Sequence, residues 1–228
     1  MSVKIIARFD TTGNLHCVGD FALKIFIDGK VSSVWYKRHG NFHNLNGPAY
    51  VLYKNEKPIQ IYYFINNNLH RIDGPAITHY HDNGILKRNE YWIHGLRHRI
   101  DLPQTEIFYT TGILRQQFYY EYGVHPNRGN PSEIKYYENG NFERVDYFDK
   151  MPNMPRSIIY YKNGRILNCT SYIDQNKFNE SVYHPNGKLA IKCYHEHGRK
   201  NIYDYYNLSG VLFKKQKYHN KFVRNTNA

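Results

Sequence analysis

The sequence predicts an all-β fold, an elongated single-layer antiparallel sheet or β-solenoid of about eight hairpin repeats. Three observations predict it. Turn dipeptides recur along the 228 residues at nearly constant spacing, aromatic residues lie at fixed distances from them, and helical periodicity is absent. The 23 Tyr and 12 Phe argue against a disordered chain, because disordered chains are poor in aromatic residues.

Eight turn dipeptides mark the repeats. Their second residues are 27 or 28 residues apart up to Gly140 and 23 or 24 residues apart after it. Asn-Gly between extended segments indicates a two-residue hairpin turn in which both central residues have positive φ. The second repeat has Asn55-Glu56 at this place. The other repeats provide turn glycines at Gly29, Gly84, Gly112, Gly140, Gly164, Gly187 and Gly210.

The repeat array is expected to cover residues 22–220, with long repeats to about residue 150 and short repeats after it. Residues 1–21 are expected to form N-terminal strands that cap the array, since a terminal repeat otherwise exposes an unpaired strand edge. Residues 221–228 form a basic, polar tail.

The long repeats contain an extra segment with proline. Pro48, Pro75, Pro103 and Pro131 recur within FHNLNGPA, LHRIDGPA, RHRIDLPQ and VHPNRGNPS. Asp or Asn followed by Gly-Pro favours a turn, because the Asx side chain caps it and Pro fixes φ. We therefore expect longer loops along one edge of the sheet, which is where repeat proteins usually bind their partners.

Aromatic residues follow most turns by seven or eight positions. If no bulge intervenes, positions two and eight after the turn glycine share one face of the sheet, and neither face is uniformly apolar. This pattern argues against a two-sheet sandwich and favours a single layer stabilised by aromatic stacking between neighbouring repeats. The expected aromatic ladder consists of Tyr36, Tyr63, Trp92, Tyr119, Tyr147, Phe148, Tyr172, Tyr194 and Tyr218.

The segments YYENGNFERVDYF, YYKNGRILNCTSY and YHPNGKLAIKCYH resemble the variant form of the MORN repeat, a Tyr- and Gly-rich unit that builds chains of β-hairpins. The resemblance covers roughly residues 22–220. Two departures are that glycines of the second turn are mostly missing and that the first repeats carry the HRIDGPA-type insertion. MORN-like proteins with such insertions are common in large double-stranded DNA viruses, and related arrays occur in bacteria.

The resemblance implies a non-enzymatic structural scaffold or protein–protein interaction module. Its viral members suggest a virion structural component, either a minor capsid protein or a capsid-associated protein, working within a larger assembly. The bacterial members suggest an antitoxin-type binding protein as an alternative. Sparse, unpatterned cysteines indicate a reducing compartment, so we expect an intracellular, cytoplasmic protein, present in the virion if it is viral.

The net charge of +12 and a pI near 9.4 favour an acidic partner. The expected partner is an acidic protein surface. The alternative function is that of a peripheral protein that binds nucleic acid or an anionic membrane. An AT-rich genome, which encodes many Lys, explains the same excess without any function. Arg88, Arg144 and Lys214, each four positions after a turn glycine, are candidates for a basic track, or are simply solvated positions of an exposed face.

Two further candidates for partner binding are the pairs His70-Arg71 and His98-Arg99, each followed by Ile-Asp. The alternative is structural, with each Arg stacked on a neighbouring aromatic ring and paired with the local Asp73 or Asp101.

No motif for catalysis or cofactor binding is found. His79 and His81 have alternate spacing, as do His195 and His197, but no Cys pair or carboxylate cluster near them in sequence completes a metal site. There is no nucleophile elbow and no Gly-rich phosphate loop before a helix. No apolar stretch reaches about 18 residues, the length of a membrane span. We therefore expect no enzyme activity, no cofactor, no metal and no small-molecule substrate.

Overall fold

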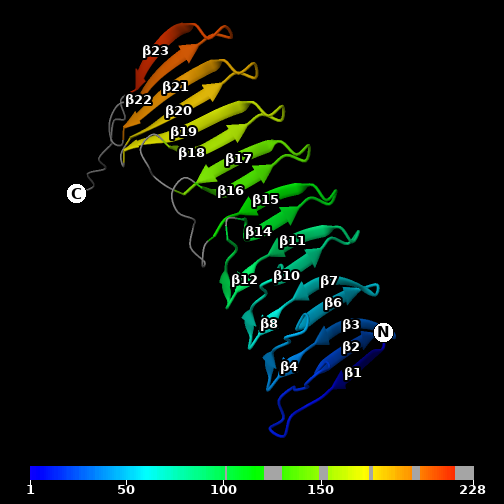
Figure 1. Cartoon of the computed structure of the whole chain (residues 1–228). Helices are drawn as coiled ribbons and strands as arrows, with labels where there is room; N and C mark the ends of the chain where they lie inside the picture. Colours follow the sequence, from blue (N-terminus) through cyan, green and yellow to red (C-terminus); the bar gives the residue numbers. More distant parts are fainter. Residues whose placement is uncertain (101, 121–129, 149–153, 175–176, 197–200, 219–228) are drawn as a thin grey trace, which may run out of the picture. The chain divides into compact units, whose positions relative to one another are not determined.

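The computed structural model describes residues 1–100, 102–120, 130–148, 154–174, 177–196 and 201–218. All regular secondary structure in these ranges is β-strand, which confirms the predicted all-β class (Figure 1). Within the same ranges, no helix is long and apolar enough to cross a membrane. The chain divides into two compact units, Met1–His125 and Pro126–Ala228, which are described separately.

The first unit is an open antiparallel ladder of nine strands, which lie side by side in chain order (Figure 1). Its first strand lies within the residues expected to cap the array. The strands are β1 (Val3–Ala7), β2 (Leu23–Ile27), β3 (Lys30–Trp35), β6 (Tyr50–Lys54), β7 (Lys57–Tyr62), β10 (Ile77–Tyr80), β11 (Leu86–Glu90), β14 (Thr105–Phe108) and β15 (Leu114–Phe118).

Three short hairpins interrupt this ladder at the strand ends opposite the turn dipeptides (Figure 1). Each follows a long hairpin in the chain and leads into a loop that carries the proline segment. They are β4–β5 (Lys37–Arg38, Asn41–Phe42), β8–β9 (Phe64–Ile65, Asn68–Leu69) and β12–β13 (Trp92–Ile93, Leu96–Arg97).

The second unit is an open ladder of eight consecutive antiparallel strands. As in the first unit, the described strands form one layer and its end strands do not pair with each other, which confirms the predicted single-layer antiparallel architecture. The strands are β16 (Pro131–Tyr136), β17 (Phe142–Tyr147), β18 (Pro155–Tyr160), β19 (Ile166–Asp174), β20 (Lys177–Tyr183), β21 (Leu189–Glu196), β22 (Asn201–Tyr206) and β23 (Leu212–Tyr218).

The seven turn glycines all have positive φ, between 78° and 86°. The prediction that both central residues have positive φ holds for Asp28-Gly29 and Asn55-Glu56, but it is wrong for the six later turns. In the turn before β11, the Gly84 amide donates to the His81 carbonyl over 2.8 Å, and the His81 amide donates to the Ile85 carbonyl. The loop therefore has three residues, and only its last one is left-handed.

A β-bulge follows the turn in all eight long hairpins. Between β10 and β11, His79 faces Arg88 and Tyr80 faces Leu86, so that Lys87 is an extra residue. The extra residue reverses the alternation of side chains. Positions two and four after the turn therefore lie on opposite faces, and the prediction that positions two and eight share a face is wrong.

Turn side chains join neighbouring repeats. The Asn83 side-chain amide donates to the Thr110 carbonyl over 2.9 Å, and the Asn186 amide donates to the Leu208 carbonyl over the same distance. The Tyr137 hydroxyl similarly donates to the Tyr160 carbonyl over 2.8 Å. Such bonds join neighbouring repeats along the edge of each unit and help to fix the phase of the repeats.

Candidate functional site

Four loops of related sequence make up one edge of the first unit, at the strand ends opposite the turn dipeptides. We call them the loop edge: residues 16–21 (HCVGDF), 43–48 (HNLNGP), 70–75 (HRIDGP) and 98–103 (HRIDLP), residue 101 being outside the described ranges. Their histidines are 27, 27 and 28 residues apart. The pattern therefore begins with the first 21 residues, one repeat earlier than the sequence analysis placed it.

In the first three loops, the histidine holds the turn of a short hairpin. His16 Nδ1 accepts a hydrogen bond from the His39 amide over 3.1 Å, and His70 Nδ1 accepts one from the His94 amide over 3.2 Å. His39 and His94 are the first residues of two-residue turns and have φ of 47° and 50°. In the same way, the Asn66 amide donates a hydrogen bond to His43 Nδ1 over 3.3 Å.

The long repeats therefore do contain a second turn, which the sequence analysis missed. It is formed by His39-Gly40, Asn66-Asn67 and His94-Gly95, where both residues have positive φ. The dipeptides His-Gly and Asn-Asn at a fixed distance before the next loop histidine were the available signal. The closing hydrogen bond goes to the histidine of the preceding loop, 23 or 24 residues earlier, and leaves no local signal in the sequence.

Arg71 is held inside its own repeat. Its guanidinium lies 4.0 Å from the centre of the Tyr63 ring, its Nε donates to Asp73 over 2.9 Å, and its Nη1 donates to the Pro75 carbonyl. The arginine lowers the pKa of the Asp73 carboxyl through this hydrogen bond and its charge. This is the structural alternative that the sequence left open for His70-Arg71.

Arg99 is held in a related way. Its guanidinium lies 3.8 Å from the centre of the Tyr91 ring and 3.6 Å from Glu106. The expected partner Asp101 lies outside the described residues. His98, the fourth loop histidine, is buried. Both arginines thus brace the loops instead of extending from them.

The third residue of each loop is the exception to this internal bonding. It is aliphatic in all four loops, and its side chain points into solvent. The four residues, which we call the loop tips, are Val18, Leu45, Ile72 and Ile100, with 74%, 70%, 83% and 75% of their surface exposed.

Crevices separate neighbouring loops. One of about 420 Å³ lies between the first two loops and is lined by Val18, Tyr36, Arg38 and Leu45, among others. Another, of about 430 Å³, lies between the second and third loops and includes Leu45, Tyr63 and Ile72. The loop edge therefore alternates exposed aliphatic tips with crevices whose walls contain aromatic rings.

The three candidate residues of the basic track are divided between the two units. Arg88, in the first unit, forms an ion pair with Glu90 over 2.7 Å. Arg144, in the second unit, pairs with Asp146 over 2.7 Å, and the hydrogen bond raises the pKa of Arg144. Each arginine is thus paired with a carboxylate two residues further along its own strand.

Lys214 and Arg144 belong to one row of residues that pair side by side across the strands from β17 to β23. They therefore lie on the same face of the second unit, near opposite ends of its ladder. Its ammonium lies 5.5 Å from the centre of the Tyr205 ring. Apolar residues occupy much of the row between the two cations. The row members between them are Ile159, Asn168, Val182, Ile191 and Tyr205.

Aromatic contacts in the first unit run through residues that the sequence analysis did not select. Trp35, Tyr50 and Tyr62 lie on neighbouring strands, with ring centres 5.8 and 5.4 Å apart. Phe42 and Phe64 of the short hairpins stack beside them, 5.4 Å apart. Trp35 and Tyr62 lie one position before the predicted Tyr36 and Tyr63, which follow the ends of β3 and β7.

The predicted ladder residues have several other placements. Tyr36 and Tyr63 line the crevices, and Trp92 lies against the Arg97 guanidinium. The Tyr119 hydroxyl donates to Gln117, burial raises the pKa of Tyr147, and Phe148 is exposed. Tyr172 and Tyr194 lie near Arg156 and Lys192, while Tyr218 contacts the Tyr203 ring at 5.4 Å.

The residues most suggestive of chemistry in the second unit lie on one face of β20–β22. Cys193 is buried there beside Tyr203, and His195 lies 3.5 Å from Glu180. Burial raises the pKa of the Cys193 thiol, and a hydrogen bond with Cys193 raises the pKa of Tyr203 to about 12. A thiol with a raised pKa is a poor nucleophile at neutral pH, so this arrangement stabilises the sheet and does not resemble an active site.

Comparison with known proteins gives no match: no protein-family model matches the chain, and no curated protein does.

Proposed function

We propose that the protein is a non-enzymatic scaffold that binds another protein through the loop edge of its first unit. The observation that carries the proposal is the row of four loop tips. The arginines and the first three histidines of the loops are hydrogen-bonded or ion-paired within the first unit, whereas an exposed aliphatic side chain recurs at one position in all four loops. Burying one such side chain contributes about 1.5–3 kcal/mol, so four together contribute about 6–12 kcal/mol toward binding, before the entropic cost of association.

The spacing of the tips suits a partner with a regular surface. Successive tips are two strands apart, and strands lie about 4.8 Å apart, so the tips repeat every ~10 Å along the unit. The crevices between them can accept side chains of the partner. A larger assembly, in which many copies of a partner present the same surface, is a natural setting for such an edge.

The sequence resemblance to MORN-like proteins extends this proposal. Because proteins with the HRIDGPA-type insertion are common in large DNA viruses, we assign the scaffold to the virion, as a minor capsid or capsid-associated protein made in the cytoplasm. An antitoxin-type binding protein would use the same edge on a toxin. Mass spectrometry of purified particles distinguishes the two, since only a virion component is present there in fixed proportion to the capsid protein.

Binding of nucleic acid or anionic lipid is the second candidate. It is favoured by the charge of residues 126–228, which include 17 Lys and Arg against nine Asp and Glu, a net charge of +8. Binding of this kind falls steeply with rising salt. An apolar contact through the loop tips keeps its affinity between low and high salt, so a salt titration separates the candidates.

Site-specific cross-linking tests the proposed function. A photoreactive residue is placed at Leu45 or Ile72, and at Glu56 as the control, in cells that produce the protein naturally. Glu56 is exposed in a turn at the opposite edge of the same unit. We expect one cross-linked partner protein from Leu45 and Ile72 and none from Glu56. Equal products from all three positions, or none from any, would contradict the proposal.

A further inference from the structure

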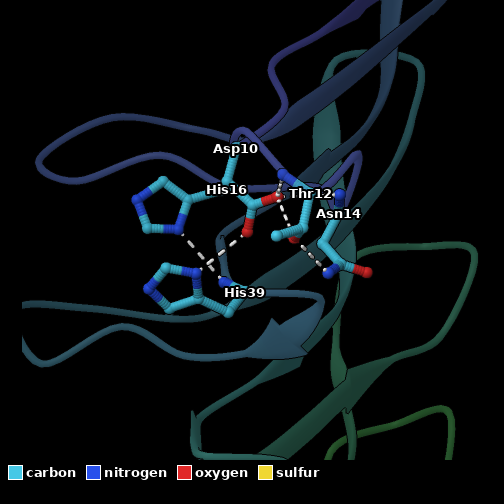
Figure 2. A network of polar contacts seen from close by, with 5 residues as sticks. All are labelled: Asp10, Thr12, Asn14, His16 and His39. Atoms are coloured by element: carbon cyan, nitrogen blue, oxygen red, sulfur yellow. Dashed lines mark hydrogen bonds and ion pairs between the residues drawn. The ribbon is translucent and has the colours of Figure 1, made fainter.

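A polar network beside the first loop holds a carboxylate in a fixed orientation (Figure 2). Asp10 Oδ1 accepts hydrogen bonds from the Thr12 amide and hydroxyl, over 3.0 and 2.6 Å, and from the Asn14 amide over 3.0 Å. Its other oxygen, Oδ2, lies 2.9 Å from His39 Nδ1. The hydrogen bonds from Thr12 and His39 hold the pKa of Asp10 well below its usual range, so the carboxylate stays ionised.

Two imidazole rings lie against this carboxylate. His16 and His39 have ring centres 4.3 Å apart, and in Figure 2 both rings lie on the same side of Asp10. One ligand atom from each of the three residues lies within 4.8 Å of the other two. The His39 side chain is 63% exposed and the Asp10 side chain 9% exposed, so the carboxylate is shielded while the histidine side is open to solvent.

The rest of the first unit shows which part of this network the fold requires. His70 and His94 form the same amide-to-Nδ1 hydrogen bond, with ring centres 4.5 Å apart, and have no carboxylate beside them in the corresponding place. Six residues before the later loop histidines, where the first repeat has Asp10, the chain has Lys37, Phe64 and Trp92. The turn therefore forms without an acid, and Asp10 is an addition to it.

We propose that Asp10, His16 and His39 bind a divalent transition-metal ion of the Zn²⁺ class. Two imidazoles and one carboxylate are ligands that such ions prefer. Tetrahedral ligand bonds of about 2.0–2.2 Å place neighbouring ligand atoms roughly 3.3–3.6 Å apart. Asp10 Oδ2 and His39 Nδ1, at 2.9 Å, need to separate by only about 0.5 Å to reach this spacing. The open side leaves further coordination positions for water.

The ion takes the place of a hydrogen bond. His39 Nδ1 and Asp10 Oδ2 lie 2.9 Å apart, and an ion bound between the two atoms displaces the hydrogen that they share. In a neutral imidazole this proton moves to Nε2, so neutral His39 binds the ion without net release of a proton. His16 Nδ1 turns from the His39 amide to the ion, so the amide loses this acceptor while the turn remains closed by the backbone pairing of β4 and β5.

The chain offers matched variants for the test. Asp10→Asn removes the charge and keeps an acceptor oxygen for Thr12 and Asn14. His39→Asn copies the second repeat, where Asn66 occupies this turn position with φ of 50°. The control is His94→Asn, which makes the same change in the pair that lacks a carboxylate.

Isothermal titration calorimetry with ZnCl₂ on the full chain measures the affinity and the number of ions bound. We expect one tight site per chain, at least tenfold weaker binding in Asp10→Asn and His39→Asn, and no change in His94→Asn. Circular dichroism confirms that each variant is folded. The absorption spectrum of Co²⁺ bound to the unmodified chain gives an independent measure of histidine and carboxylate ligation.

Three outcomes would overturn the proposal. One is weak binding of several ions, as expected for scattered surface histidines. Another is equal loss of affinity in His94→Asn and His39→Asn. The third is a Co²⁺ spectrum identical to that of the hydrated ion. Because the test needs no partner protein, it does not depend on the proposed scaffold function.

Discussion

Single side chains in this protein serve both their own turn and the next repeat. Asn186 Oδ1 accepts a hydrogen bond from the Lys188 amide inside the turn, while its Nδ2 donates to the Leu208 carbonyl of the next turn. The first bond belongs to the Asn-Gly turn and is predictable from sequence. The second depends on where the neighbouring repeat places a carbonyl, so the dipeptide alone does not reveal it.

Asn186→Asp removes the donor to the next repeat and keeps the acceptor within the turn. We expect the free energy of unfolding to fall by about 0.5–1.5 kcal/mol, the usual contribution of one hydrogen bond. Urea denaturation measures it. Asn163→Asp is the control, because Asn163 caps its own turn through Oδ1 and its Nδ2 makes no hydrogen bond within the described part of the chain. Equal losses in the two variants would contradict this role.

Glu56 is the only second turn residue of the eight long hairpins that is not glycine, and its φ is 63°. The left-handed region costs a residue with a side chain roughly 1–2 kcal/mol, and the entropy of glycine offsets part of the gain. Glu56→Gly should therefore raise the free energy of unfolding by about 0.5–1 kcal/mol, measured by thermal or urea denaturation. The control is Lys57→Gly, one residue further along in β7, which should lower the free energy of unfolding. A lower stability of Glu56→Gly would contradict the left-handed conformation of Glu56.

The short hairpins are elements whose stability depends on one loop histidine each. Burial, with a smaller contribution from His94, lowers the pKa of His70. The folded state thus favours neutral His70, whose Nδ1 accepts a hydrogen bond from the His94 amide. On acidification, His70 takes up its proton at a higher pH in the unfolded state than in the folded state. The stabilisation is complete above the ordinary pKa of about 6.5 and is lost as pH falls through the lowered value.

We therefore expect the chain to lose stability between pH 7.5 and pH 5, part of it through this hairpin. His70→Asn supplies an acceptor that does not titrate, so its stability should fall less over the same range. Urea denaturation at several pH values measures the difference. Parallel curves for the two proteins would show that His70 does not contribute to the pH dependence.

The elements differ in how well the sequence predicts them. The long hairpins follow from turn dipeptides such as Asn139-Gly140 and from the strand-forming segments beside them, which are local signals. The bulge at Lys87 or Glu143 has no such signal, because it results from how a three-residue turn joins two paired strands. Missing it led to the wrong assignment of faces.

The candidate sites show the same distinction. The period of Pro48 and Pro75 predicted loops along one edge, and the Arg-aromatic contacts were among the stated alternatives. The Asp10–His16–His39 cluster was missed, because His39 reaches it from the following repeat. In a repeat protein, residues of one site can come from neighbouring units: His39 lies 23 residues after His16 and 29 after Asp10, close to the period of 27 or 28 residues.

At the scale of the whole molecule, changes at the loop tips should affect the binding of a partner without affecting the stability of the fold. Their side chains are largely exposed, so they contribute little to the packing of the first unit. Replacing Val18, Leu45, Ile72 and Ile100 by Ser together should change the free energy of unfolding by less than about 0.5 kcal/mol per site. Urea denaturation checks this, and a loss of several kcal/mol per site would show that the tips are part of the core.

The most direct test of the account measures the yield of the cross-linked partner from a photoreactive residue at Leu45, with and without Val18→Ser and Ile72→Ser in the same chain. If the loop edge binds a protein through its tips, the yield falls at least tenfold while the chain stays folded. An undiminished yield from the folded variant would contradict that claim.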